Sequence, residues 1–209
     1  MAVDFLKWPL SAIGGVLVII IFCIFTLASI ALYPGSFSPF NNWISDLGNH
    51  SLNSDGSVIF NTGCILTGLA MLVLIAGLGK WAVKGWKKAA LAAGQACGVL
   101  SALALMLIGV FSEGTSLHGI MSITFFSLLF LLLVLTNVAL FGDTRYFRWI
   151  GYFALLAIAI DVILAYTRFA YTHDTIWEWL AVFSALLWVA LLSYNLFLIG
   201  RRKPASVEK

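Results

Sequence analysis

Residues 9–32 read PLSAIGGVLVIIIFCIFTLASIAL, a stretch without a single charged side chain. A helix of about 20 apolar residues is long enough to cross the roughly 30 Å of hydrocarbon in a bilayer. The stretch is also longer than the apolar segment of a signal peptide, which usually has about 7–15 residues. We therefore expect it to remain in the protein as a membrane-spanning helix.

Five further apolar runs follow the first, and the chain as a whole is 62% hydrophobic and only 10% charged. The runs are too long for barrel strands, which need only about 10 alternating residues. The sequence therefore predicts an all-α polytopic membrane protein, a bundle of six transmembrane helices forming a single membrane domain over residues 1–209. The predicted spans cover residues 9–33, 58–79, 89–111, 118–141, 149–168 and 176–199.

Basic residues are sorted to one side of these spans. Eleven of the 12 Lys and Arg precede the first span, follow the last one, or lie between spans two and three or four and five. Positive residues favour the cytoplasmic side, so we expect both termini in the cytoplasm and the protein in the cell membrane (plasma or inner membrane). Because topology accounts for the basic pI of about 8.8, no nucleic-acid partner is expected.

The loop that links spans one and two, residues 34–57, is external in this topology. Phe40, Trp43, Ile44 and Leu47 follow the spacing of one helical face. We expect a short helix here, with Asn41 or Asn42 as its cap and this face lying on the bilayer or on the roof of the bundle. Ser45, Asp46 and Asn49 then either satisfy turn backbone groups or help to form a pocket.

All three histidines, His50, His118 and His173, also fall on the external side. His118 lies in the first turn of span four, where the positive end of the helix dipole favours a neutral ring. A neutral ring can bind a metal or act as a base. The alternative is a structural histidine bonded to a loop carbonyl. Glu113 precedes it in the short segment between spans three and four.

Span five contains Asp161 within its apolar run and Arg168 at its external end. Acids inside a membrane span are costly and are treated as functional by default. The two residues share one helical face about 10 Å apart. Asp161 could pair with Arg168, carry a proton or serve as a structural hydrogen-bond acceptor. Arg168, the only basic residue on the external side, could neutralise a nearby acid or bind an anionic group such as a lipid phosphate.

Span three contains a G-x-x-x-G pair, Gly94 and Gly98, beside several alanines. Small residues at this spacing allow two membrane helices to approach closely, so we expect a tight helix contact there. The three cysteines, Cys23, Cys64 and Cys97, all fall within spans. They offer neither an external disulfide framework nor a metal-binding spacing.

Three segments resemble the prokaryotic membrane family known as "domain of unknown function 998", which is distantly similar to the DRAM/Sfk-like six-span proteins. They are N-W-I-S-D-L-G-N at 42–49, F-N-T-G at 60–63 and G-V-F-S-E-G followed by L-H-G at 109–119. The resemblance implies a six-helix bundle with an external polar cap and a lipid partner. The family pattern usually carries a proline where this chain has Ser112.

Three functions fit these patterns. The first is a protein that binds or organises a membrane lipid, alone, as a homo-oligomer or in a larger membrane complex; its ligand-binding residues would be Asn49, Arg168 and Asp161. The second is a metal-dependent lipid hydrolase with zinc as the candidate metal. Its catalytic residues would be Ser45, Asp46, His118 and Glu113, and its metal ligands His50, His118, His173 and Asp46. The third is a proton- or cation-coupled transporter that uses Asp161.

Overall fold

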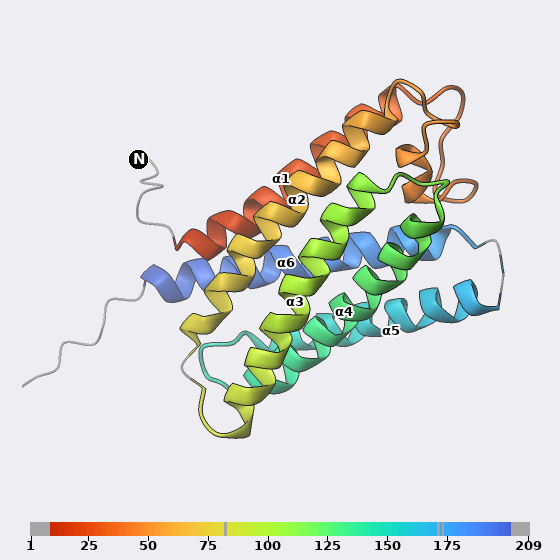
Figure 1. Ribbon diagram of the computed structural model, residues 1–209. Helices are drawn as coiled ribbons and strands as arrows, with labels where there is room; N and C mark the ends of the chain where they lie inside the picture. The colour runs from red at the N-terminus through yellow and green to blue at the C-terminus, as the bar shows by residue number, and fades with distance from the viewer. Residues whose placement is uncertain (1–8, 82, 171, 173, 202–209) are drawn as a thin grey trace, which may run out of the picture.

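The computed structural model describes residues 9–81, 83–170, 172 and 174–201, and within these ranges every regular element is helical (Figure 1). Six of the helices are long and apolar enough to span a membrane, which confirms the predicted fold class. In chain order the elements are α1 (Leu10–Ala31), η2 (Ile44–Gly48), α2 (Ser57–Ala76), η3 (Gly77–Lys80), α3 (Trp86–Val110), α4 (Ser116–Leu140), α5 (Arg148–Phe169) and α6 (Ile176–Arg201).

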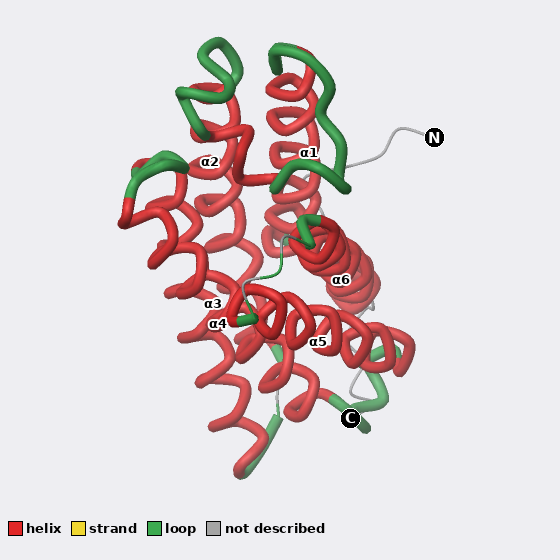
Figure 2. Tube along the Cα trace, turned by 90° about the vertical axis from the view of Figure 1, so that its right-hand side faces the viewer, coloured by secondary structure: helices red, strands yellow, loops and turns green. Residues whose placement is uncertain are grey.

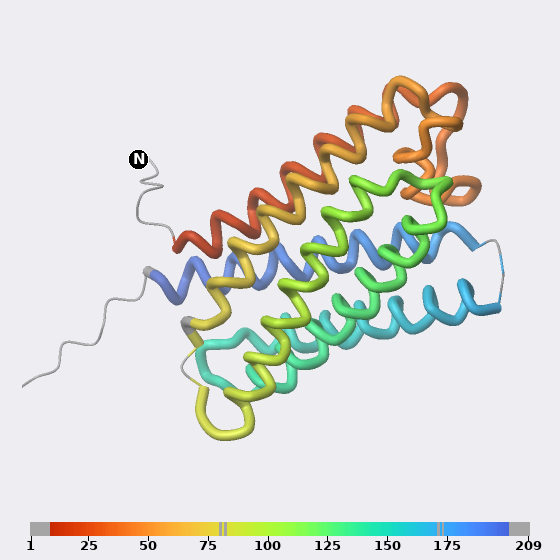
Figure 3. The backbone as a smooth tube through the Cα atoms, viewed as in Figure 1, coloured from red at the N-terminus to blue at the C-terminus, as the bar shows by residue number. Residues whose placement is uncertain are grey.

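The six long helices pack in the order of the chain, and α6 returns to pack against α1. Figure 2 looks onto the end of the bundle that carries residues 32–56, called here the loop end. At the loop end α3 ends and α4 begins, and α5 ends and α6 begins there too, whereas α1 begins and α6 ends at the opposite end (Figure 3). The six helices therefore form a closed ring of neighbours. Of the pairs that are consecutive in the chain, α4 and α5 pack least closely.

The G-x-x-x-G prediction is confirmed. A methyl group on Gly94 would touch Leu135 and Thr136 of α4, and one on Gly98 would touch Ile75 of α2 and Leu132 of α4. The small residues therefore let α3 approach both of its neighbours closely, as is usual for membrane helices.

The helix predicted in the long loop forms, but it is shorter and tighter than expected. It is a 3₁₀ helix of five residues, Ile44–Gly48, with Trp43 as its N-cap in place of Asn41 or Asn42. Ile44 and Leu47 point into the bundle and are buried, whereas Phe40 precedes the helix and is 76% exposed. The four apolar residues therefore do not share one helical face. The helix covers only Ile44 and Leu47 of the four, and a 3₁₀ helix has about three residues per turn.

Replacing Gly109 by alanine should destabilise the bundle, because a methyl group there would overlap the backbone carbonyl oxygen of Asn61 and crowd Ile65. Overpacking of this kind typically costs about 1–3 kcal/mol. We expect a melting temperature several degrees lower in detergent. Gly119→Ala is the matched control, because nothing lies within 4 Å of the added methyl group. Equal melting temperatures for the two variants would contradict the close contact of α2 with α3.

Candidate functional site

The first turn of α6 holds the long loop in place. The Glu178 carboxylate is buried and accepts a hydrogen bond of 2.8 Å from the Ile44 backbone N–H. The Ser45 N–H donates to the same carboxylate. These are the first two amides of η2, which lack partners within a helix. An acid from a segment 134 residues further along the chain therefore caps the loop helix.

Two more bonds join the same turn to the loop. The Thr175 hydroxyl donates to the Pro39 carbonyl at 2.7 Å, and the Trp179 indole N–H donates to the Asn42 carbonyl at 2.9 Å. Because all three contacts come from one helical turn, they position residues 39–45 as a unit against α6.

Two asparagines hold the later part of the loop, residues 47–56. The fully buried Asn53 donates to the Leu47 carbonyl and to the Ser29 hydroxyl, and its oxygen accepts from the Gly56 N–H. Asn61 of α2 donates to the Gly48 carbonyl at 3.1 Å and to the Ser112 hydroxyl at 3.0 Å. The second bond links α2 to the α3–α4 connection, and a proline at position 112 could not accept it.

Several predicted site residues have local structural partners. Asp46 accepts a hydrogen bond of 2.9 Å from the Trp43 N–H, and Asn49 accepts one of 2.9 Å from the Ser51 N–H. His50 is exposed, and its Nδ1 lies 3.4 Å from the Ser57 hydroxyl. These contacts match the turn-stabilising alternative for Asp46 and Asn49.

His118 is buried and has an oxygen partner at each ring nitrogen. Its Nδ1 lies 2.9 Å from the Phe111 carbonyl oxygen, and its Nε2 forms an ion pair of 2.6 Å with Glu113. Two acceptors suit a protonated ring, in contrast to the neutral ring expected from the helix dipole. In this arrangement neither nitrogen is free to bind a metal or to activate Ser45.

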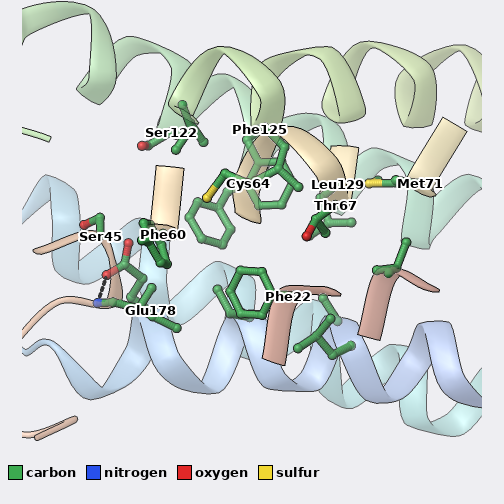
Figure 4. A pocket seen from close by; sticks show the side chains of 18 of the residues that line it. Phe22, Ser45, Phe60, Cys64, Thr67, Met71, Ser122, Phe125, Leu129 and Glu178 are labelled. Carbon is green, nitrogen blue, oxygen red and sulfur yellow. Dashed lines mark hydrogen bonds between the residues drawn. The ribbon is translucent and has the colours of Figure 1, made fainter. Parts of the chain in front are cut away.

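A small inner cavity of about 80 Å³ lies inside the bundle at the loop end. Ser45, His118 and Glu178 line it among mostly apolar side chains. Figure 4 shows Ser45 and Glu178 at one end, Met71 at the other, and Phe60 and Cys64 between them. The cavity has room for only a few water molecules.

A much larger groove of about 900 Å³ lies between α4 and α5. Its walls are mainly apolar, and Trp43 and Arg168 contribute to it from the loop end. Ser122 and Glu178 line both this groove and the inner cavity. The α4 residues that line the groove are Ser122, Ile123, Phe126, Ser127, Phe130 and Leu131, and those of α5 are Asp161, Val162, Leu164, Ala165, Arg168 and Phe169.

The groove lies at the loop end because α4 and α5 are joined at the opposite end. There the Asn137 side chain donates to the Gly151 carbonyl at 3.0 Å and accepts from the Tyr146 hydroxyl at 3.1 Å. Side-chain amides that bond across membrane helices hold them together. No hydrogen bond between α4 and α5 is found among the described residues that line the groove.

Arg168 is tied to the long loop. Its guanidinium carbon lies 4.4 Å from the centre of the Trp43 ring, a cation–π contact. Its positive charge also acts on Glu113 and Glu178. Arg168 therefore acts on nearby acids, which is one of the two roles that the sequence suggested for it.

Asp161 has no such partner. It is 7% exposed and lines the groove, and both of its carboxylate oxygens lack a hydrogen-bond partner among the described residues. Arg168 therefore does not pair with it directly, because the guanidinium is held at the Trp43 ring.

Apart from Asp46, Asn49 and His50, which have local partners in the loop, the described site residues fall into two groups. Ser45 and His118 line the inner cavity, with Glu113 attached to His118, whereas Arg168 and Asp161 line the groove. Among the described residues, no three His, Cys, Asp or Glu side chains could hold a metal ion together. His173, one of the predicted ligands, lies outside the described residues. The zinc site stays a prediction.

The sequence analysis missed the central role of Glu178. Thr175-Ile176-Trp177-Glu178 matches the S/T-x-x-E capping-box pattern, which would assign Glu178 to the start of its own helix. The carboxylate instead caps a different helix, and only the folded arrangement reveals it. Asn61 lies in the F-N-T-G segment that carries the family resemblance, but its hydrogen bonds appear only in the folded structure.

Replacing Glu178 by leucine should loosen the loop, because the Ile44 and Ser45 amides would lose a charged acceptor. Hydrogen bonds to charged groups contribute about 1.5–3 kcal/mol, so we expect these amides to exchange at least about tenfold faster by hydrogen–deuterium mass spectrometry. Glu178→Gln, which keeps an acceptor oxygen, should show a smaller increase. Unchanged exchange of residues 40–48 in the leucine variant would rule out the capping role.

The Glu113–His118 pair should make stability depend on pH. The hydrogen bond and charge of His118 hold the pKa of the Glu113 carboxyl below its usual value of 4.5, although burial opposes this. A lowered pKa stabilises the fold at higher pH, and this contribution is lost as the pH falls through the lowered pKa.

Glu113→Gln should therefore have a lower melting temperature than the wild type at pH 6, and the difference should vanish as the pH is lowered below 4.5. The exposed-loop variant Asp55→Asn serves as the control. A difference between wild type and Glu113→Gln that stays constant down to pH 3 would be the contrary result.

Comparison with known proteins agrees with this architecture. The family model described as "Protein of unknown function (DUF998)" matches residues 16–195, which include all six long helices in whole or in part. Neither the curated proteins nor the solved structures contain a match to the chain. The protein is a six-helix membrane protein that belongs to the DUF998 family.

Proposed function

We propose that the protein binds a membrane phospholipid in the groove between α4 and α5. The observation that supports this most strongly is the groove itself, an apolar cavity of about 900 Å³ with a few charged groups at defined depths. Ligand sites in proteins commonly measure about 300–1,000 Å³ and combine apolar walls with a small number of polar groups.

The position of the groove fits a ligand that arrives from the bilayer. Several lining residues, among them Ile123, Val162 and Phe169, are 54–77% exposed on the outer surface of the bundle. In a bundle of membrane-spanning helices this surface faces lipid. A phospholipid can therefore enter sideways, without passing through the loop.

The polar groups indicate how the lipid would lie. Trp43 and Arg168 stand at the mouth, and Asp161 lies seven residues, or about 10 Å, deeper along α5. The head group would occupy this upper part of the groove. The acyl chains would follow the apolar side chains further along α4, such as Phe130 and Leu131.

The distribution of basic residues supports a cell-membrane protein with both termini in the cytoplasm and the groove mouth on the outer side. The bound lipid would then come from the outer leaflet. Assembly as a homo-oligomer or within a larger membrane complex remains a prediction of the same kind.

The two alternative functions draw less support from the geometry. A hydrolase would need a free His118 nitrogen near Ser45, and both ring nitrogens face other oxygens. A proton- or cation-coupled transporter could use the unpaired Asp161. Transporters of this type commonly bind their ions at interrupted helices, whereas α5 is continuous from Arg148 to Phe169.

Filling the groove should remove the lipid. Ala165 is exposed and lines the groove on α5, so Ala165→Trp would occupy part of the space without disturbing the core. We expect native mass spectrometry to find lipid bound to the wild type and to Ala96→Trp, which places the same side chain on an exposed face of α3 away from the groove. Ala165→Trp should lose it. Equal lipid occupancy in all three proteins would refute binding in this groove.

A further inference from the structure

Asp161 is the one charged side chain of the groove whose charge is not balanced by a neighbour among the described residues. Three charged residues line the groove: Asp161, Arg168 and Glu178. The Glu178 carboxylate receives the amides of Ile44 and Ser45 and lies in the field of Arg168. Both oxygens of Asp161 are buried without any hydrogen-bond partner.

An unpaired carboxylate at this depth is costly. Burying a charged group without a partner is strongly unfavourable, and breaking a buried ion pair by removing one partner typically costs about 3–5 kcal/mol. Intramembrane acids therefore pair with another group or face a cavity from which a partner can arrive. Asp161 faces such a cavity.

Arg168 cannot serve as that partner while it stacks on Trp43. Its guanidinium also already balances acidic groups at the mouth, since it acts on both Glu113 and Glu178. The positive charge of Arg168 is therefore engaged at the mouth, whereas Asp161, deeper in the groove, has no partner among the described residues. A ligand that complements this pattern carries a positive group at the depth of Asp161.

We propose that Asp161 binds the primary ammonium of an aminophospholipid head group, so that the groove selects amine-bearing lipids. This inference rests on the proposed lipid-binding function and adds the identity of the head group. A primary ammonium brings both a positive charge and three N–H donors, and charge-assisted hydrogen bonds are about twice as strong as neutral ones. Two acceptor oxygens without partners can use these donors directly.

This recognition separates three head groups of similar size. Ethanolamine offers charge and donors, choline offers charge without N–H donors, and glycerol offers hydroxyl donors without charge. Since the carboxylate needs both properties, phosphatidylethanolamine should bind best. Phosphatidylcholine should bind less well, and phosphatidylglycerol should bind least.

The test is competition for the purified full-length protein among these three lipids at equal concentration, with matched acyl chains, read out by native mass spectrometry. We expect phosphatidylethanolamine to be preferred over phosphatidylglycerol by about tenfold, since one charged hydrogen bond is worth at least that factor. Asp161→Asn, which keeps the shape of the side chain and removes its charge, should bind all three lipids nearly equally. Asp174→Asn, an exposed acid outside the groove, should keep the wild-type preference.

The outcomes separate the two proposals. If the wild type binds none of the lipids, the proposed function itself fails. If the wild type binds lipid in the groove without an amine preference, or if Asp161→Asn keeps that preference, lipid binding stands and the role of Asp161 is overturned. If Asp161→Asn does not fold, two other measurements test the role of Asp161. Asp161→Glu, which retains the carboxylate, must keep the amine preference. The wild type must still rank the three lipids in the predicted order.

Discussion

The hydrogen bond from the Ile44 N–H to the buried Glu178 carboxylate is the interaction on which the loop end depends. It joins a helix near the end of the chain to a loop near its beginning. Without an acceptor there, the first amides of η2 would be buried unpaired, which proteins avoid. Since Trp43 immediately precedes Ile44, the same bond fixes the ring on which Arg168 stacks. The position of Arg168, the only described Lys or Arg at the loop end, therefore follows from a capping interaction.

The groove results from an uneven distribution of contacts around the bundle. The asparagine at position 137 ties α4 to α5 at the opposite end, and the glycines of α3 bring α2, α3 and α4 together closely. Among the described residues that line the groove, no hydrogen bond joins α4 to α5 toward the loop end. The bundle is thus tightly packed on one side and open on the other, where Arg168 is held at the mouth and Asp161 remains unpaired below it.

The sequence predicted the parts of this structure that arise from composition and short-range pattern. Six apolar runs predicted six helices, and the glycine spacing predicted close contacts of α3. The sequence could not predict that Glu178 caps η2 or that Arg168 stacks on the Trp43 ring. Each of these contacts joins segments more than 120 residues apart in the chain. A local pattern was misleading in the long loop, where the apolar spacing suggested one helical face. For His118 the helix dipole favours a neutral ring, whereas the two oxygen neighbours favour a protonated one.

Arg168 is held at the Trp43 ring, and both carboxylate oxygens of Asp161 lack a partner among the described residues, so this carboxylate is open to a ligand in the proposed lipid groove. The most direct measurement is photo-crosslinking with a phospholipid that carries a photoreactive group in its head region, followed by mapping of the labelled peptides in the reconstituted protein. Labelling concentrated on residues 122–131 of α4 and 161–169 of α5 is the predicted result. Labelling spread evenly over α1, α2 and α3, with no enrichment at these two segments, would contradict lipid binding between α4 and α5.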